Sequence, residues 1–490
     1  MAEIKQGYHG RGGCAFHGAL WTVSSIRNLT AVVHSNAGCS AQGHLAARGA
    51  GIGFPELFQT PTTSSIDRHV VFGGGSRLRE QIKNTVKIID SKLYVVLQGC
   101  ESAMVGDDVT GITREALEAT HPVLCSLVAG LHGGSRFGYA KVLSDLLGSV
   151  GELKGLAGFE PDIGQESSVN VFGVVPVTDP HFRGDLFEIL RILNGLGLSA
   201  NIFFGASDGV EELSNAKQAK LSLVFSKWGR QPAEKLLESA DQAVLERSCL
   251  PVGFEAVKAL KDAIAEKLGE CSLGAGAQSF LESERVRQER LLEPLDEWLG
   301  EIVGAPVALV GDESAITGLA KFLRDRLGAE ISLAVITDAS DAGDMWDRSE
   351  ICDQAETYEQ AETIEGAFVC AAQESGVKKF EADGGAGNRN DETIDQLAAR
   401  VHRCGDGAEI SEILTKARPL VVLGGAPDEA VAKKLGAGYL NVSFPSSEIV
   451  LGRSFVGLHG AVALAEKYAS EVFKALDFKE ASAALKLVGS

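Results

Sequence analysis

Residues 309–328 read LVGDESAITGLAKFLRDRLG, where an apolar strand leads through a short loop into a helix closed by Gly328. Most other apolar runs of the chain are followed by helical periodicity in the same way. Buried parallel strands have continuous apolar sequences, whereas strands with one solvated face alternate. Strands that alternate with helices are typical of layered α/β folds. The pattern therefore predicts an α/β fold in which helices flank parallel sheets.

The expected elements divide the chain into three units. At about 150 residues per domain, a chain of 490 residues has room for three. Expected strands lie at 93–97, 169–177, 202–204, 221–225, 307–310 and 420–423, and expected helices at 185–196, 232–245 and 315–327. A long charged helix at 279–299 is expected to separate the two halves. We expect domains at 1–165, 166–300 and 301–430, with a helical tail at 431–490 that packs back on the core.

The composition is that of an ordinary globular protein. Hydrophobic residues are 45% and charged residues 23% of the chain, which excludes a disordered polypeptide. No apolar run approaches the ~20 residues of a membrane span, and the first residues lack the apolar core of a signal peptide. The expected location is the cytoplasm. Since no dinucleotide fingerprint or P-loop is present, we expect this chain to bind no nucleotide.

Charge is distributed unevenly along the chain. The net charge of −20 argues against a nucleic-acid-binding protein. Residues 338–412 hold 19 acidic and 6 basic side chains, a pattern expected of a solvated acidic face. Residues 1–100, in contrast, hold ten Lys or Arg and five Asp or Glu. This basic segment contains three of the nine cysteines.

Those three cysteines differ from the others in their surroundings. An odd number of cysteines in a chain expected in the cytoplasm argues against disulfides. Six are expected to be inert core residues, namely Cys125, Cys249, Cys271, Cys352, Cys370 and Cys404. Cys14, Cys39 and Cys100 instead each precede or begin an expected helix, and Cys100 also follows an expected strand. Helix starts favour thiolates, and ligands collect at the carboxyl ends of parallel strands.

The spacing of these cysteines indicates what they could bind. Thiolates select iron–sulfur clusters, zinc or Cu(I). Spacings of 25 and 61 residues are too long for a local zinc knuckle and suit a larger inorganic cluster. An all-thiolate iron–sulfur cluster is anionic, so the basic segment around it is electrostatically favourable. From spacing alone, inert buried cysteines remain the alternative.

Four segments, in order, carry a more specific pattern. They read CAFHGALWTVSSIRNLTAVVHSNAGCSAQG at 14–43, GCESAMVGDDVTGI at 99–112, LVAGLHGGSRFGYAKVL at 127–143 and NVSFPSSEIVLGRSFVGLHGAVAL at 441–464. This set resembles the nitrogenase component 1 family. In that family a first cysteine precedes a small-residue helix and an HGxxGC-type segment, and a third cysteine opens a loop that ends in GDD. The resemblance implies three Rossmann-like domains with parallel sheets flanked by helices.

The resemblance also implies ligands and a cofactor. Cys14, Cys39 and Cys100 would be the metal ligands that this chain contributes to an iron–sulfur cluster of the P-cluster type ([8Fe-7S]). Ser135 lies 35 residues after Cys100, as does the serine that can bind the oxidised P-cluster in β subunits of the family. An ordinary loop serine is the alternative reading of Ser135. Catalytic residues are expected in the partner subunit and not in this chain.

Two segments resemble the β-type subunit more than the α-type. The α-type subunit holds the catalytic cofactor through a cysteine in the second domain and a histidine in the third. Here the corresponding second-domain segment, KLSLVFSKWG at 220–229, has no cysteine. The C-terminal segment carries Arg453 and Ser454 in the β style, with His459 as the only histidine nearby. The catalytic iron–sulfur-based cofactor is therefore expected in the partner.

The resemblance implies an electron-relay role. An ATP-dependent iron protein with its own [4Fe–4S] cluster would deliver electrons to the P-cluster, which passes them to the α-type subunit of an α2β2 heterotetramer. By elimination among family branches, the leading hypothesis is a nitrogenase-like methylthio-alkane reductase that cleaves C–S bonds. The alternatives are a true nitrogenase β subunit that reduces dinitrogen and a non-catalytic scaffold for cofactor assembly.

Neighbouring polar residues are interpreted more plainly. Asp107 and Asp108 are expected to cap the helix that begins near Val109, since helix starts favour carboxylates. His17 and His34 are expected to be hydrogen-bonded core histidines. Of the two, His34 is the preferred candidate for an outer contact to the cluster.

Overall fold

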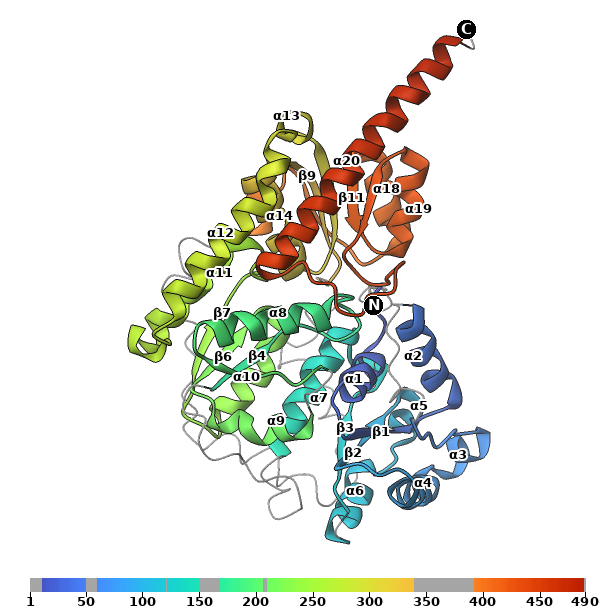
Figure 1. The fold of residues 1–490 in the computed structure, drawn as a ribbon. Coiled ribbons are helices and arrows are strands. Elements are labelled where there is room, and N and C mark those ends of the chain that lie inside the picture. Colours follow the sequence, from blue (N-terminus) through green and yellow to red (C-terminus); the bar gives the residue numbers. More distant parts are fainter. Residues whose placement is uncertain are drawn as a thin grey trace.

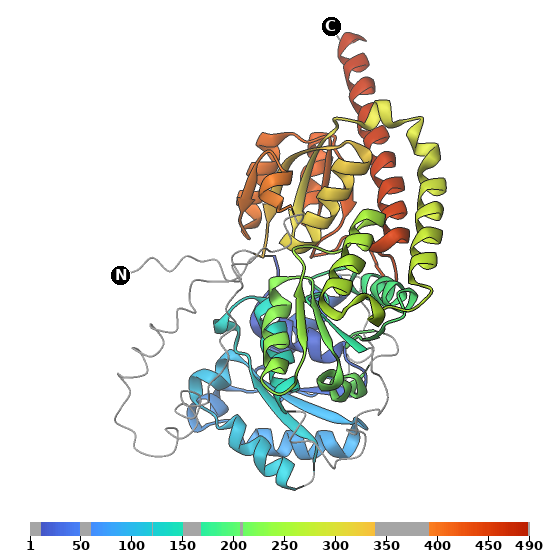
Figure 2. The same cartoon turned by 90° about the vertical axis from the view of Figure 1, so that its left-hand side faces the viewer.

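The computed structural model describes residues 11–49, 60–119, 121–149, 168–205, 209–338 and 392–488. Three parallel sheets follow one another along the chain, each flanked by helices (Figure 1). In the view turned by 90°, the first domain lies at the bottom, the second in the middle and the third at the top (Figure 2). The predicted α/β class with parallel sheets is confirmed. Within the described residues, no helix is long and apolar enough to cross a membrane.

The first sheet has the order β1-β2-β3, and all its pairs are parallel. Its strands are β1 (Leu29–His34), β2 (Leu93–Gln98) and β3 (Val123–Leu127). Helices α1 (Ala15–Ser24), α2 (Ala37–Gly49), α3 (Asp67–Phe72), α4 (Gly75–Ile88), α5 (Cys100–Val105), α6 (Val109–Glu118) and α7 (Ser135–Ser149) complete the domain. Val95 of β2 faces the core with α1 and α7, while Val96 faces the core with α4 and α6. Both faces are thus buried, which explains the continuous apolar run of β2.

The second sheet has the order β5-β4-β6-β7 and is also parallel. Its strands are β4 (Ser168–Phe172), β5 (Ser199–Asn201), β6 (Leu221–Val224) and β7 (Ala243–Glu246). Its helices are α8 (Phe182–Gly195), α9 (Val210–Asn215), α10 (Arg230–Leu237) and α11 (Gly253–Leu268). Helix α12 (Ala277–Asp296) then leads away from this domain and runs alongside the C-terminal helix (Figure 2).

The third sheet has the order β10-β9-β8-β11-β12. Its strands are β8 (Pro306–Gly311), β9 (Glu330–Ile336), β10 (Val401–Arg403), β11 (Val421–Gly424) and β12 (Gly438–Asn441). Its helices are α13 (Leu299–Ile302), α14 (Glu313–Leu327), α17 (Ile394–Leu397), α18 (Gly407–Ala417) and α19 (Ala426–Leu435). The long α20 (Gly457–Val488) packs against α11, α12 and β12, and its end extends beyond the domain (Figure 1).

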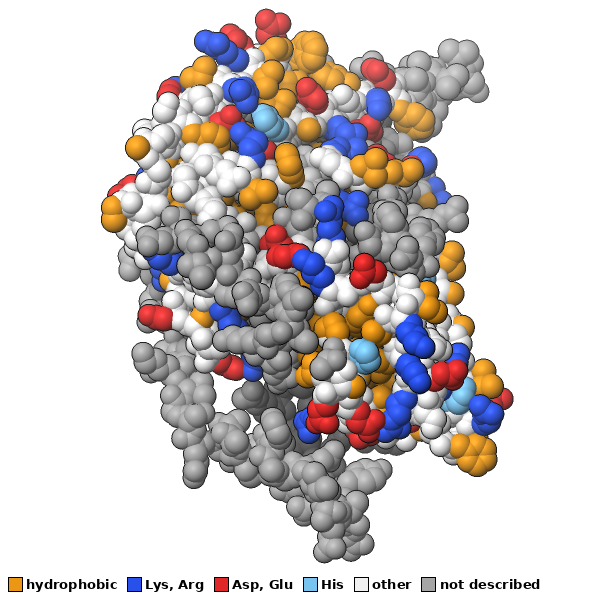
Figure 3. All heavy atoms as spheres, turned by 60° about the horizontal axis from the view of Figure 1, so that its bottom comes forward, with side chains coloured by type: hydrophobic (Ala, Val, Ile, Leu, Met, Phe, Trp, Pro, Cys, Tyr) orange, Lys and Arg blue, Asp and Glu red, His pale blue; other side chains and the backbone are white. Residues whose placement is uncertain are grey.

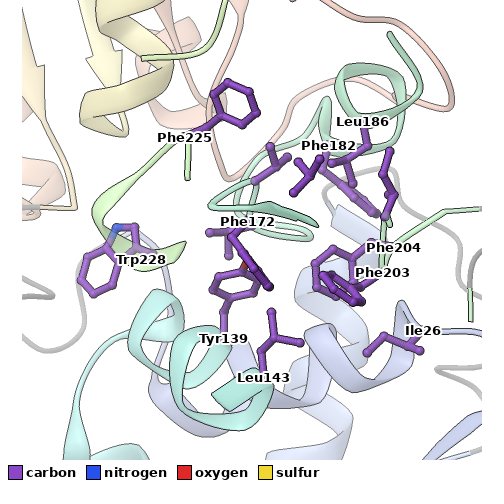
Figure 4. Packing of buried hydrophobic residues seen from close by; sticks show 14 of the residues in the cluster. Ile26, Tyr139, Leu143, Phe172, Phe182, Leu186, Phe203, Phe204, Phe225 and Trp228 are labelled. Carbon is purple, nitrogen blue, oxygen red and sulfur yellow. The ribbon is translucent and has the colours of Figure 1, made fainter. Parts of the chain in front are cut away.

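A continuous apolar core joins the first two domains. Tyr139 and Leu143 on α7 pack toward Phe172 of β4, beside Phe203 and Phe204 (Figure 4). The Tyr139 hydroxyl accepts a hydrogen bond from the backbone N–H of Gly173 at 3.0 Å. Helix α7, which begins at Ser135, is therefore fixed from both domains.

Some expected boundaries differ from the structure. The helix expected at 232–245 is wrong at its end, because α10 stops at Leu237 and 243–246 form β7. The strand expected at 169–177 ends at Phe172, and the one expected at 202–204 lies earlier, at 199–201. Strand β12 belongs to the third sheet, which therefore extends past residue 430, where the C-terminal tail was expected to begin. Most of the acidic segment at 338–412 lies outside the described residues.

Candidate metal centre

Three predicted ligands follow the carboxyl ends of the three strands of the first sheet. Cys39 lies in the first turn of α2 after β1, Cys100 begins α5 after β2, and Ser135 begins α7 after β3. Because the strands are parallel neighbours, their carboxyl ends lie at one edge. The fold thus brings together residues that are 96 positions apart in sequence. This edge is where ligands collect in α/β sheets.

Cys14 reaches the same edge from a different direction. It is the N-cap residue of α1 and forms an isolated antiparallel bridge with Gly134. The Ala15 N–H donates to the Gly133 carbonyl at 2.8 Å, and the Ser135 N–H donates to the Gly13 carbonyl at 3.1 Å. The start of α1 is therefore attached to the loop that carries Ser135.

A glycine keeps space open beside two of the thiols. A Cβ on Gly130 would lie 2.9 Å from the Cys14 Sγ and 3.2 Å from the Cys100 Sγ. The two sulfurs therefore face the same small volume, which any side chain at position 130 would fill. Cys39 lies within electrostatic range, since negative charge on Cys14 or Cys100 contributes to raising its pKa.

Ser135 is a buried polar residue at the same edge. The residue is 0% exposed, and its hydroxyl has no hydrogen-bond partner among the described residues. Leaving a buried hydroxyl unpaired costs about 1–3 kcal/mol. Such a cost is expected where the oxygen can bind a group supplied from outside the chain.

Burial has the largest effect on the pKa values of two thiols, Cys14 and Cys39. Burial raises the pKa of Cys14, although nearby backbone N–H groups lower it in part. Burial likewise raises the pKa of Cys39. The backbone at the start of α1 thus acts on Cys14 in the predicted direction, and burial outweighs it. A bound metal ion would reverse this balance, because a coordinating thiol is deprotonated.

The donor set fits a multi-iron cluster better than a single ion. Within the described ranges, no three His, Cys, Asp or Glu side chains are close enough to hold one metal ion. Two half-buried thiols, Cys14 and Cys100, lie beside Gly130, and Cys39 is within electrostatic range of both. Together with the Ser135 hydroxyl, which is unpaired among the described residues, they suit a larger thiolate-bound group. That these residues are ligands stays a prediction.

The two histidines differ in what they contact. His34 lies 3.2 Å from the Thr63 hydroxyl and 3.0 Å from the Asp107 carboxylate, so it is a hydrogen-bonded core histidine. His17, in contrast, has its Nδ1 3.6 Å from the Cys14 Sγ. A contact of His34 with a cluster stays a prediction, while His17 is the histidine seen beside the sulfur of a predicted ligand. The i, i+3 spacing of Cys14 and His17 on one helix could have revealed this contact.

The neighbouring aspartates have different roles. Asp108 is the N-cap of α6 and accepts from the Gly111 N–H at 2.8 Å, which confirms its predicted capping. Asp107 instead accepts from the Gly74 N–H at 2.8 Å and contacts His34. It joins the start of α4 to β1, because a carboxylate can accept from several donors at once.

The other cysteines are less uniform than expected. Cys404 is buried, as predicted, but Cys271 is exposed, and Cys125 and Cys249 are half-buried. The prediction of an inert core residue is therefore wrong for Cys271. Cys352 and Cys370 lie outside the described residues.

A separate cavity of about 390 Å³ lies between the second and third domains. Its lining includes Ser226 and Lys227 after β6, Glu313 and Thr317 of α14, and Asp338 after β9. It contains no cysteine or histidine among its described lining residues. His459 lies elsewhere, with its Nδ1 3.7 Å from the Glu188 carboxylate.

Comparison with known proteins identifies the family. The protein-family model that describes nitrogenase component 1 type oxidoreductases matches residues 14–473. The chain belongs to the nitrogenase component 1 family. Its fold is similar to a structure described as nitrogenase Cp1 at pH 6.5, with a TM-score of 0.69, 18% identity, and 95% of this chain and 93% of that chain covered. The fold predicted from the resemblance is confirmed.

Curated relatives have more than one role. The chain is 25% identical over 291 residues to the nitrogenase iron-molybdenum cofactor biosynthesis protein NifE of Nostoc sp., covering 58% of this chain and 57% of that protein. It is 24% identical over 355 residues to the nitrogenase molybdenum-iron protein beta chain of Bradyrhizobium diazoefficiens, covering 67% and 65%. These matches span about half to two thirds of each relative's length.

Proposed function

We propose that this chain is the β-type subunit of a nitrogenase-like reductase. It would hold an iron–sulfur cluster of the P-cluster type through Cys14, Cys39 and Cys100, with Ser135 as a further ligand on oxidation. The observation that carries this proposal is the position of all four residues at one edge of the first sheet. A bound cluster would accept and release electrons one at a time.

The chain's own residues would position that cluster and limit its contact with water. The helix starts fix the cysteines, Gly130 leaves space for inorganic sulfur and iron, and α7 anchors Ser135 against the core. An unpaired alkoxide oxygen at Ser135 is a hard donor, so it would stabilise the more oxidised, more positive state. Burial and hydrogen bonding around the sulfurs would set the reduction potential.

The cavity between the second and third domains supports the β-type role. An iron–sulfur-based cofactor held by this chain would need soft ligands, and from the segment 220–229, where the α-type subunit is expected to carry a cysteine, the cavity is lined by Ser226 and Lys227. His459 is half exposed beside Glu188 and does not line the cavity. We therefore assign the catalytic cofactor to an α-type partner.

The surface near the cysteines supports a role for partner proteins. The thiols are half-buried and not enclosed, so a second chain could complete the cluster's ligands. Large apolar side chains are exposed on α2, α3 and α5, namely Leu45, Ile66, Val70, Val71, Phe72 and Met104. Figure 3 views this end of the molecule, where apolar side chains lie exposed among charged ones. Such a patch is typical of protein interfaces, here with the α-type subunit and an ATP-dependent iron protein.

The proposed reaction is reductive C–S cleavage of methylthio-alkanes. It rests on elimination among family branches by resemblance, and reduction of dinitrogen is the alternative. In the deciding assay, the anaerobic complex is combined with its cognate iron protein and ATP. Either a methylthio-alkane or N₂ is then given as the substrate. Formation of a thiol and an alkane supports the proposal, whereas ammonia as the product contradicts it.

A second candidate function is a scaffold for cofactor assembly. It is favoured by the similarity to NifE, which is described as a cofactor biosynthesis protein. A scaffold would transfer its metal cluster to another protein and show no turnover with the iron protein. Turnover by the purified complex without added acceptor protein therefore excludes this candidate.

The ligand assignment is tested by single substitutions. Cys39→Ala in the anaerobically purified complex should lower the iron content and abolish the electron paramagnetic resonance signal of the shared cluster. Cys125→Ala, a half-buried cysteine on β3, is the matched control and should leave both unchanged. An intact signal in Cys39→Ala contradicts the assignment.

A further inference from the structure

His17 is the polar side chain that joins two of the predicted ligand segments. It lies on the first turn of α1, three residues after Cys14, and its Nδ1 is 3.6 Å from the Cys14 Sγ. On the opposite side of the ring, Nε2 lies 3.1 Å from the carbonyl oxygen of Cys39. One imidazole thus contacts the side chain of one predicted ligand and the backbone of another.

The hydrogen-bond chemistry fixes the orientation of this ring. A carbonyl oxygen can only accept, so Nε2 must carry a proton and donate it to Cys39. The second nitrogen, Nδ1, then faces the sulfur of Cys14. The His17 ring also stacks on Trp21, with centroids 5.8 Å apart and planes inclined by 20°. The ring can therefore not rotate away without losing both contacts.

Trp21 makes a parallel contact one helical turn away. Its Nε1 donates to the Gly43 carbonyl at 3.0 Å. His17 and Trp21 are four residues apart on α1, as are Cys39 and Gly43 on α2. Two side chains of α1 therefore bind two backbone carbonyls of α2 in the same manner. Of these two side chains, His17 also contacts a cysteine sulfur and, among the described residues, Trp21 does not. Trp21 is therefore a suitable control.

The close packing around His17 leaves it little freedom. A Cβ on Gly43 would lie 3.3 Å from the His17 Cδ2, and one on Gly13 would lie 3.8 Å from the His17 Nδ1. The Gly43 contact is tighter than usual, so glycine at position 43 helps the ring fit between the two ligand segments, whereas the Gly13 contact is an ordinary one. Outer-shell groups held this way orient metal ligands and tune the bound metal.

We propose that His17 is a positioning residue that sets the separation of Cys14 and Cys39 and tunes the potential of the group they hold. This inference rests on the proposed function, because it requires a cluster at these cysteines. His17 is not itself a ligand. It acts through the Cys39 backbone and through its contact with the Cys14 sulfur.

Three variants of the anaerobic complex separate these contacts. His17→Leu removes both, while His17→Gln keeps an amide N–H that can reach the Cys39 carbonyl. Trp21→Phe removes the parallel contact and keeps an aromatic ring. The measurements are iron per complex, the rate of iron release to a chelator, the midpoint potential of the cluster and the thermal unfolding midpoint.

His17→Leu should release iron about 10 to 100 times faster than the wild type and should shift the midpoint potential. His17→Gln should recover most of the slow release, and Trp21→Phe should lower the unfolding midpoint without shifting the potential. The inference is overturned if His17→Leu leaves both the midpoint potential and the rate of iron release unchanged. It is also overturned if His17→Leu and Trp21→Phe shift the midpoint potential equally. Wild-type complex without iron at these cysteines contradicts the proposed function instead.

Discussion

Ser135 is the residue whose environment is hardest to explain by folding alone. Its hydroxyl is fully buried and has no partner among the described residues, while Arg136 beside it forms a bidentate ion pair with Asp312. Selection for stability would favour alanine at position 135, because an apolar side chain has no hydrogen bond to lose. A ligand role gives the hydroxyl a reason to be there.

Ser135→Ala should therefore leave the free energy of unfolding unchanged or raise it by about 1 kcal/mol. In the complex with bound cluster, Ser135→Ala should raise the midpoint potential of the cluster, because the oxidised state loses a hard oxygen donor. Ser144→Ala on the same helix is the control, since its hydroxyl donates to the Ala140 carbonyl at 2.7 Å. Redox titration and chemical unfolding measure both effects. An unchanged potential would remove Ser135 from the proposed ligand set.

Single residues were predicted from the sequence with mixed success. The capping role of Asp108 follows from local spacing and is confirmed. The contact of His17 with Cys39 was missed, because it depends on how α1 packs against α2. The effect of the backbone on the Cys14 pKa was predicted in the right direction, but the larger effect of burial was missed, because burial depends on tertiary structure that a helix start does not reveal.

At the level of elements, two helices interlock at the candidate site. A Cβ on Gly18 of α1 would lie 1.7 Å from the Ser135 carbonyl oxygen, and one on Gly138 of α7 would lie 1.9 Å from the Ala15 carbonyl oxygen. Each helix thus needs a glycine where the other's backbone crosses it. This close approach places Cys14 and Ser135 side by side.

Gly138→Ala should destabilise the chain by about 3 kcal/mol, the upper end for overpacking, because backbone atoms cannot move aside. It should also reduce the iron content of the complex by separating α1 from α7. Gly148→Ala, near the end of α7, meets only the flexible Lys235 side chain and should be neutral or stabilising by up to about 1 kcal/mol. Urea unfolding distinguishes the two; similar losses for both variants would argue against the interlock.

Elements with strong apolar runs were predicted well, and short ones were not. The strands at β2, β8 and β11 were found because both faces are buried and the sequence is continuously apolar. Strand β7, with the sequence AVLE, was read as the end of a helix, since four residues carry too little periodicity. The carboxyl ends of β1, β2 and β3 bring the predicted ligands together because the three strands are parallel neighbours. The spacing of the cysteines alone does not reveal this strand order, which was expected only from the family resemblance.

For the whole molecule, ion pairs connect the domains around the candidate site. Arg136 and Arg11 of the first domain pair with Asp312 and Asp428 of the third. Lys227 of the second domain lies 3.3 Å from the buried Asp338 carboxylate, which also accepts from the Trp228 Nε1 at 2.9 Å. No sequence pattern predicts such pairs, because the partners are 100 or more positions apart.

The Asp338 contact predicts a pH dependence. Burial raises the pKa of Asp338, but the charges of Lys227 and Arg136, together with hydrogen bonds from the Glu313 N–H and the Trp228 indole, outweigh it, and the pKa lies below its usual value. The unfolded value is about 3.9, so this contribution to stability is complete above that pH and is lost as the pH falls through the folded-state pKa. The stability difference between wild type and Asp338→Asn should therefore be constant from about pH 5 to 7 and shrink below about pH 4. A difference that stays constant to pH 3 in chemical unfolding contradicts this.

The most direct test of the central claim is Mössbauer spectroscopy with an iron count on the ⁵⁷Fe-labelled anaerobic complex of this chain with its α-type partner. The account predicts an eight-iron cluster at the subunit interface that is lost in Cys100→Ala. A single [4Fe–4S] cluster, zinc in place of iron, or an eight-iron spectrum that survives Cys100→Ala would contradict it.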